Sequence, residues 1–233
     1  MKTIMITSFI MLSIHPLLPA QETIEKSFPL KSGQKVVLDL KFANEIKVGS
    51  WDKNELLIKA EVLINEGKLN HAHTIDTASD SNTLTILTGL DEGTLKESQQ
   101  TECNNGSIYN FDDSKEGSTY RLCSKINYAI YLPADTNFKI ETIAGNISMT
   151  NMKNAIEAKS ISGSVDLIIA ETQKVDVYLK SVMGQVLTDV DVNFANSSEK
   201  AIIRRQLSGK LNGGGEIIRL ESVSGNVLLK SAN

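Results

Sequence analysis

Aromatic and imidazole side chains are scarce in this sequence. Phe, Trp and Tyr make up 5% of its 233 residues, and it has three histidines, one of them within the first twenty residues. Histidine is the usual general base and the usual activator of a nucleophilic cysteine. Because neither His71 nor His73 lies near a cysteine in the sequence, a catalytic cysteine is not favoured. We expect a protein that is not an enzyme and that uses no cofactor.

Long apolar runs are also missing, with one exception near the start. Residues 4–14 form an uncharged apolar stretch after Lys2, too short to cross a bilayer, and Ala20 precedes Gln21. This pattern predicts a signal peptide over residues 1–20 and an exported product, either periplasmic or on the cell surface. No cysteine adjoins the stretch, so a bacterial lipid anchor is not expected, and no later stretch is long and apolar enough for an integral membrane segment.

A strong excess of one charge is absent too. The formal net charge is −4, and removal of Lys2 with the signal peptide would change it to about −5. Nucleic acids and anionic membranes attract basic surfaces, so this mild acidity argues against both as the main partner. It identifies no partner by itself.

Two cysteines are present, Cys103 and Cys123. In an exported chain an even number of cysteines predicts a disulfide, and closure of a loop of this length contributes about 3 kcal/mol in the chain-entropy model. Two free thiols or a metal-binding pair are the alternatives. The loop between them contains Tyr109, Phe111 and Tyr120, which either form a binding surface or pack the loop against the rest of the protein.

Alternating, β-branched segments follow almost everywhere after residue 25. They predict strands over residues 34–42, 55–64, 82–90, 126–133 and 137–143. Residues 66–82 and 91–122 look irregular. We expect one β-repeat domain over residues 21–233, with N-terminal strands over 21–135, a loop over 91–122, and repeated rungs over 136–233.

The second half contains a repeat centred on glycine. Related phrases occur as "ETIAGNISM", "AKSISGSVDL", "LKSVMGQVLT" and "ESVSGNVLLKS", around Gly145, Gly163, Gly184 and Gly225. The separations of 18, 21 and 41 residues fit a period of about 20, with a skipped copy at Gly209. Such a period indicates either stacked rungs of a β-solenoid or successive hairpins of a meander. We favour an all-β, β-solenoid or β-helix-like roll of short strands.

Each repeated glycine is interpreted as a corner between two short strands. Glycine accepts positive φ without a Cβ clash, so it suits a bend better than the interior of a flat strand. The apolar residues two before and two after each glycine are then expected to face inward, and the polar residue directly after it to face solvent. These three sets are Ile143, Ile161, Val182 and Val223; Ile147, Val165, Val186 and Val227; and Asn146, Ser164, Gln185 and Asn226.

Four weaker candidates for chemistry remain, and each has a plainer interpretation. His71 and His73 would share one face of a strand and could bind a metal, or they are solvated loop residues. Asp189 and Asp191 could act as paired carboxylates, or they form the polar half of an amphipathic strand. Trp51 could stack on a sugar, or it packs in the core or covers a turn. The last is Asp112, Asp113 and Glu116, which form a calcium-like loop or a solvated acidic turn.

The whole chain after residue 20 resembles the bacterial exported "putative adhesin" β-strand-repeat family. The matching text includes "LKFANEIKVGSWDKNELLIKAEV", "INYAIYLPADTNFKIETIAGNISM" and "LNGGGEIIRLESVSGNVLLK". The glycine triplet at residues 213–215, the alternating strand after it and the corner "SGNV" are the most specific part. The resemblance implies an all-β solenoid or roll in the cell envelope, and the family has no established catalytic residues to carry over.

Together these features favour a structural or binding protein of the bacterial envelope, whose partner is an envelope protein or a glycan. An accessory protein of envelope signalling, which binds a periplasmic partner, is the alternative. A polysaccharide-active β-helix enzyme is a weaker one.

Overall fold

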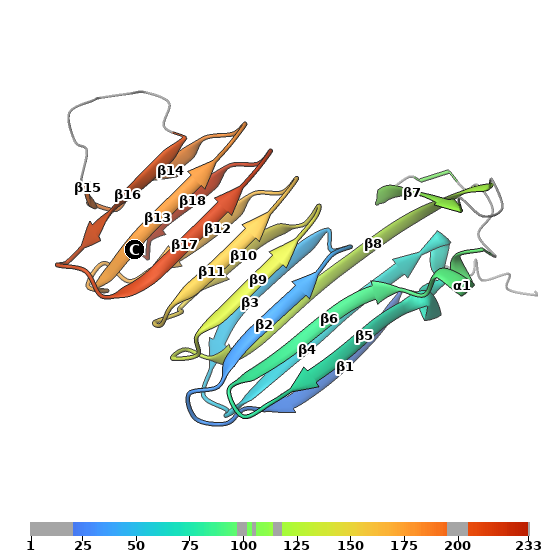
Figure 1. Cartoon of the computed structure of the whole chain (residues 1–233), viewed down its shortest axis with the longest axis horizontal. Helices are drawn as coiled ribbons and strands as arrows, with labels where there is room; N and C mark the ends of the chain where they lie inside the picture. Colours follow the sequence, from blue (N-terminus) through green and yellow to red (C-terminus); the bar gives the residue numbers. More distant parts are fainter. Residues whose placement is uncertain (1–20, 97–101, 104–105, 114–117, 195–204, 233) are drawn as a thin grey trace, which may run out of the picture.

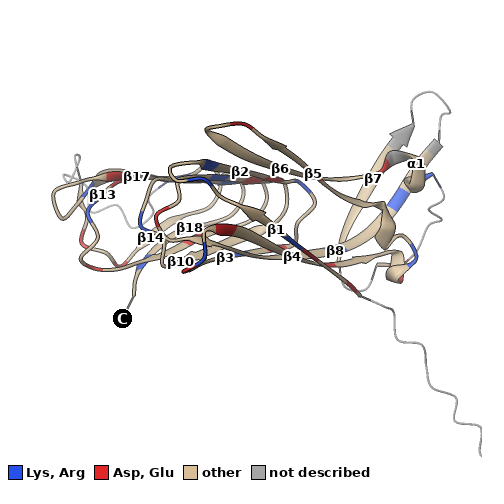
Figure 2. Ribbon diagram, turned by 90° about the horizontal axis from the view of Figure 1, so that it is seen from below, with Lys and Arg blue, Asp and Glu red and all other residues tan. Residues whose placement is uncertain are grey.

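The computed structural model describes residues 21–96, 102–103, 106–113, 118–194 and 205–232. In these residues the chain is all-β, and its strands form two mixed, nine-stranded sheets. Figure 1 shows the strands side by side along the long axis, and Figure 2 shows the two sheets as stacked layers. No helix in the described residues is long and apolar enough to cross a membrane.

Sheet A runs from antiparallel strands at one end to parallel strands at the other. In spatial order it contains β1 (Glu22–Pro29), β4 (Glu55–Ile64), β8 (Ser118–Pro133), β3 (Glu45–Trp51), β10 (Asn146–Thr150), β12 (Val165–Ile169), β18 (Val227–Ser231) and β14 (Val186–Thr188), and β7 (Ser107–Asp113) pairs with β8.

Sheet B has a parallel centre, which faces the parallel part of sheet A, and antiparallel pairs at both of its ends. In spatial order it contains β15 (Asn193–Phe194), β16 (Gln206–Leu211), β13 (Val175–Ser181), β17 (Glu216–Ser222), β11 (Ile156–Ser160), β9 (Phe138–Thr142), β2 (Lys35–Leu40), β6 (Thr83–Leu90) and β5 (His73–Ser79). Short helical turns lie between strands at η1 (Asn65–Gly67), η2 (Asn70–Ala72) and α1 (Glu92–Leu95).

The repeat region is built by alternation between the two sheets. β9 lies in sheet B, β10 in sheet A, β11 in sheet B and β12 in sheet A, and each strand pairs in parallel with the corresponding strand of the next rung. Successive strands from β9 to β14 are therefore not hydrogen-bonded hairpin partners. The hairpin meander considered from the sequence is wrong for this region.

The last rung in the sequence is not the last rung in space. β17 lies between β11 and β13, and β18 lies between β12 and β14. The β13–β14 rung therefore comes earlier in the sequence, but the β17–β18 rung lies between it and the β11–β12 rung. Gly209, expected to mark a skipped corner, lies instead in β16, which pairs antiparallel with β13. The 41-residue gap reflects this β15–β16 excursion rather than a degenerate fifth rung.

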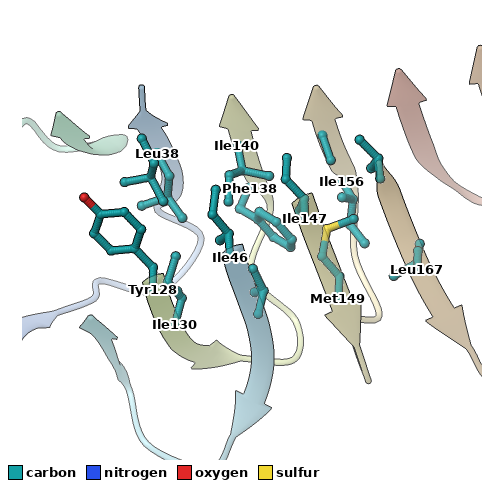
Figure 3. Packing of buried hydrophobic residues seen from close by; sticks show 14 of the residues in the cluster. Leu38, Ile46, Tyr128, Ile130, Phe138, Ile140, Ile147, Met149, Ile156 and Leu167 are labelled. Carbon is teal, nitrogen blue, oxygen red and sulfur yellow. The ribbon is translucent and has the colours of Figure 1, made fainter. Parts of the chain in front are cut away.

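The core fills the space between the two sheets. Alternation places every second residue inside, as in β11, where Ile156, Ala158 and Ser160 are buried and the residues between them are exposed. Figure 3 shows the apolar side chains of several rungs meeting between the layers. Its labelled members are Leu38, Ile46, Tyr128, Ile130, Phe138, Ile140, Ile147, Met149, Ile156 and Leu167.

Two segments that look irregular in the sequence contain strands. Residues 73–79 form β5 on the edge of sheet B, and residues 107–113 form β7. Both strands lie at sheet edges, where one face meets solvent, so their residues are largely polar. This polar composition lacks the alternating apolar pattern that identifies strands in the sequence. The N-terminal region therefore has more regular structure than its sequence indicates.

Candidate binding surfaces

The four repeated glycines lie where the chain passes from sheet B to sheet A. Gly145 follows β9 and precedes β10, and the other three occupy the same place in their rungs. The expected positive φ is wrong for all four. The glycines with positive φ in the described part of the chain are Gly33, Gly67, Gly213 and Gly214.

Crowding between stacked rungs explains the glycines instead. A Cβ on Gly163 would lie 2.0 Å from the carbonyl oxygen of Gly145, and a Cβ on Gly225 would lie 2.3 Å from that of Gly163. Gly184 would meet the oxygen of Gly225 in the same way, at 2.3 Å. At these three corners the backbones approach too closely for any side chain to fit, whereas a Cβ on Gly145 would make a less severe contact, 3.0 Å from Ala43.

A ladder of hydroxyl groups holds the same corners together, and we call it the hydroxyl ladder. Ser160 accepts a hydrogen bond from Gly163 N at 2.8 Å and donates one to the oxygen of Gly145 at 2.9 Å. Ser222 repeats this pattern with Gly225 N and the oxygen of Gly163, both at 2.8 Å. Each hydroxyl satisfies one amide of its own corner and one carbonyl of the preceding rung.

The other two members are Thr142 and Ser181. Sequence reasoning missed all four, although the signal was available, because a Ser or Thr stands three residues before every repeated glycine. These buried hydroxyls occupy inward positions that the hydrophobic pattern assigns to apolar residues. They are tolerated there because both of their hydrogen-bonding roles are used.

The apolar residues beside the glycines divide between the two sides of the corner. Ile147, Val165, Val186 and Val227, which follow the glycines, are buried as expected. The residues two before the glycines were expected inside, and this is wrong. Ile143, Ile161 and Val182 have exposed fractions of 40%, 44% and 46%, while Val223 is partly exposed. The hydroxyl ladder takes the inward place, and alternation turns its neighbours outward.

These exposed residues stack from rung to rung along one edge of the molecule. Backbone hydrogen bonds join the rungs here, with Ser162 N donating to the oxygen of Ile143 and Ser224 N to that of Ile161. Met183 follows Val182 in the terminal rung, lies next to Ser224 of the neighbouring rung and is 72% exposed, so it adds apolar surface beside the row. We call this surface the corner ridge and define it by Ile143, Ile161, Val182, Met183 and Val223.

Of the polar residues after the glycines, Asn146, Gln185 and Asn226 are exposed, as predicted, and Ser164 is partly exposed; they also form a ladder. Asn146 Oδ1 accepts from Ser164 N at 2.9 Å, and Asn226 Oδ1 accepts from Gln185 N at 3.0 Å. These side chains satisfy backbone groups at the start of each sheet A strand, so they belong to the scaffold.

The outer face of sheet B carries two rows of alternating charge. The in-register neighbours of one row are Lys139, Glu157 and Arg219, and those of the other are Glu141, Lys159, Glu221 and Lys180. In Figure 2, ribbon segments coloured for basic and for acidic residues both occur on the strands of this layer. Opposite charges on neighbouring strands favour this register, whereas a shifted one would juxtapose like charges. The face has no single-sign patch of the kind that binds nucleic acid.

The predicted disulfide joins the start of the β7–β8 hairpin to β8. Cys103 and Cys123 are bonded, with their Cα atoms 5.3 Å apart. This excludes the alternatives of free thiols and of a metal-binding pair in this structure. The hairpin lies at the end of the molecule opposite the β13–β14 rung (Figure 1).

Two of the three aromatic residues of this hairpin pack against Phe42. The rings of Phe42 and Tyr109 are 5.2 Å apart in an edge-to-face arrangement, and those of Phe42 and Phe111 are 6.2 Å apart. Burial raises the pKa of the Tyr109 hydroxyl. Tyr120 pairs with Phe111 across the hairpin and is half-buried. A binding role for the three aromatics stays a prediction.

The two histidines do not meet at a common site. His71 is exposed in η2, whereas His73 is 8% exposed and its Nε2 lies 2.7 Å from the hydroxyl of Tyr128. Burial, with a smaller contribution from the positive charge of Lys26, lowers the pKa of His73 to about 4. No cluster of three or more metal-ligating side chains occurs among the residues that the structure describes.

Asp189 and Trp51, which were candidates for catalysis and for sugar binding, make contacts within the protein. Asp189 and Asp191 are both exposed, alternating with buried valines, and Asp189 accepts a hydrogen bond from Ser231 N at 2.9 Å. Trp51 covers the β3–β4 turn, with its Nε1 donating to the oxygen of Glu55 at 2.8 Å and its ring against Tyr131. The acidic loop candidate cannot be placed, because Glu116 and the side chains of its two aspartates lie outside the described residues.

Comparison with known proteins gives a likeness in fold. No family model matches the sequence, and no curated protein matches it. A "putative cell adhesion protein" from Clostridium sporogenes matches with a TM-score of 0.57 and 12% identity, over 91% of this chain and 100% of that chain. A "putative adhesin" from Bacteroides fragilis, also at 12% identity, has a TM-score of 0.21, too low to carry an argument. This chain therefore shares an all-β fold with a protein described as adhesive.

Proposed function

We propose that this chain is an exported, adhesin-like binding protein of the bacterial cell envelope and that it is not an enzyme. Its parallel rungs would act as a β-solenoid scaffold that presents side chains at regular spacing. Export is supported by the predicted signal peptide and by the Cys103–Cys123 disulfide, since such bonds persist in oxidising compartments. The fold shared with a protein described as adhesive supports a binding role.

The observation that carries this proposal is the corner ridge. Exposed apolar residues are normal when scattered, but a contiguous row on a rigid support marks an interaction surface. Met183 alone is 72% exposed, and Val182 beside it is 46% exposed. Neighbouring rungs lie about 4.8 Å apart, so the ridge is a continuous apolar edge suited to an apolar surface of another envelope protein.

The test measures binding of the purified, labelled chain to isolated bacterial envelopes. A Val182→Glu/Met183→Glu variant should bind at least about tenfold more weakly, because a desolvated charge would face the partner. Ile217→Glu is the matched control, since Ile217 is 56% exposed on sheet B and away from the ridge. Equal binding by all three proteins would reject the ridge as the binding surface.

Localisation and lack of catalysis are tested separately. Cell fractionation with protease treatment of intact cells should place the chain in the periplasm or on the surface, and a cytoplasmic location would contradict the proposal. Release of reducing ends from a polysaccharide panel would support the enzyme alternative. We expect none, since Asp189 is already engaged with the backbone of Ser231.

A further inference from the structure

A polar pocket lies at the edge of the sheets opposite the glycine corners. Its volume is about 230 Å³, and four turns line it: those between β1 and β2, β3 and β4, β8 and β9, and β10 and β11. Drug-sized ligands occupy pockets of roughly 300–1,000 Å³, while one water takes about 30 Å³. The pocket therefore suits a ligand smaller than a typical drug but much larger than a water molecule.

The walls of this pocket are held in place by hydrogen bonds that do not involve a ligand. Gln34 is 4% exposed, and its amide donates to the oxygen of Asp80 at 3.0 Å and accepts from Lys31 N at 3.1 Å. Asn137 Oδ1 accepts from Ala155 N at 3.1 Å. Asn154 donates to the backbone oxygen of Asp135. Walls fixed in this way lose little entropy when a ligand binds.

Three other groups of the lining have polar atoms that remain unused. Thr136 is 8% exposed, and its hydroxyl makes no hydrogen bond with any residue that the structure describes. The side-chain amide of Asn54 and the carboxylate of Asp135 likewise have no partner among the described residues. The Thr136 hydroxyl is not sealed from solvent, and Asn54 and Asp135 are exposed, so all three groups are available to a ligand that enters the pocket.

The composition of the lining defines the ligand. One carboxylate (Asp135) and one ammonium (Lys31) nearly cancel, so a strongly charged ligand is not favoured. Amides and a hydroxyl both donate and accept, as the hydroxyl groups of a sugar do. We propose that this pocket binds a single neutral sugar residue, a hexose or an N-acetylhexosamine, at the end of a glycan. This goes beyond the proposed function, because it adds a second site with its own ligand class.

The experiment titrates the purified chain with glucose, galactose, mannose and N-acetylglucosamine. Saturation-transfer NMR detects binding to the sugar protons, and Trp51 provides an independent optical signal. Trp51 is the single tryptophan of the chain, and it pairs in register with Pro133, which lines the pocket. We expect at least one of these sugars to bind with millimolar affinity and to change the emission of Trp51.

Variants then locate the binding. Thr136→Val and Asn54→Ala should each weaken the affinity by about five- to tenfold, the effect of one lost hydrogen bond. Thr136→Ser keeps the hydroxyl and should retain binding. Asn110→Ala, an exposed amide on β7 at the other end of the molecule, is the matched control and should leave the affinity unchanged. Melting temperatures confirm that each variant is folded.

Two results would overturn this inference: no binding of any of the four sugars at tens of millimolar, or undiminished binding by folded Thr136→Val and Asn54→Ala. A chain that binds envelopes through its ridge but no sugar would leave the proposed function standing without this pocket. A chain that binds a sugar but no envelope would support the pocket and contradict the proposed function.

Discussion

At the scale of single residues, contacts between neighbouring backbones restrict which side chains fit at the corners of this protein. A glycine is required at Gly163 because a neighbouring backbone carbonyl occupies the place of its Cβ. A hydroxyl is required at Ser160 because an amide and a carbonyl converge on it. The demand for glycine arises between rungs, and the demand for a hydroxyl arises partly within its own corner and partly between rungs.

Gly163→Ala tests the crowding account. Because the added Cβ would meet the Gly145 carbonyl at 2.0 Å, the free energy of unfolding should fall by about 3 kcal/mol or more. Gly33→Ala is the control for conformational strain alone, since Gly33 has φ +75° and nothing within 4 Å of its Cβ position, and it should cost about 1 kcal/mol. Chemical denaturation measures both. A smaller effect at Gly163 than at Gly33 would contradict the account.

His73 should make stability depend on pH. Its pKa is about 4 in the folded chain against 6.5 for an ordinary histidine. Between these values the unfolded chain binds a proton that the folded chain does not, so stability falls as the pH drops from about 6.5 to 4. The loss approaches about 3 kcal/mol and is absent above pH 7.

The measurement is denaturation at a series of pH values between 4 and 7.5. His73→Gln keeps a polar partner for Tyr128 but cannot titrate, so its profile should lack this loss. His71→Gln, at an exposed histidine, should keep the wild-type profile. Parallel profiles for wild type and His73→Gln would show that His73 does not contribute.

At the scale of elements, strands are held in register by side chains on both faces. Hydroxyls and apolar groups repeat on the inside, and alternating charges repeat on the outside of sheet B. The β7–β8 hairpin lies at the end of sheet A and has the disulfide as an additional support.

Replacement of both cysteines by serine should therefore act locally. The bond joins residues 20 apart in the sequence, so its loss should lower the free energy of unfolding by about 3 kcal/mol in the chain-entropy model. Hydrogen exchange should become faster in β7, while β9 and β11 keep their protection relative to the global unfolding limit. Wild-type protein under reducing conditions should match the variant, and equal stability of the oxidised and reduced chains would refute this prediction.

At the scale of the whole molecule, the order of rungs differs from the order of the sequence. The C-terminal strands β17 and β18 occupy an interior rung, and the earlier strands β13 and β14 lie beyond them. The β17–β18 rung is therefore paired on both sides by strands that come earlier in the sequence.

A truncation tests this arrangement. Deletion of residues 215–233 removes the only described strand partner of β14 and one of the two partners of β13. Cooperative unfolding should be lost for the terminal part of the stack. Deletion of residues 21–30 removes only β1, which is an edge strand of sheet A. This deletion should cause a much smaller loss of stability. Calorimetry compares the two, and equal tolerance of both deletions would contradict the observed rung order.

Much of this architecture could be predicted from the sequence because strand alternation is a local property. The strands at residues 55–64 and 138–142, the buried valines after the glycines and the disulfide all follow from patterns within a few residues. The fate of Ile143 and Ile161 could not be predicted, since period-two alternation is compatible with either face until the corner geometry is known.

The sequence by itself determined the all-β class, the positions of many strands and the recurrence of a glycine where the chain passes from one sheet to the other. Only the tertiary structure decided why glycine is needed, where the last rung lies, and which polar groups meet in one pocket. Local patterns report what each residue prefers along its own strand. Contacts between rungs depend on segments such as residues 160–163 and 222–225, which lie far apart in the sequence and meet only when the sheets have formed.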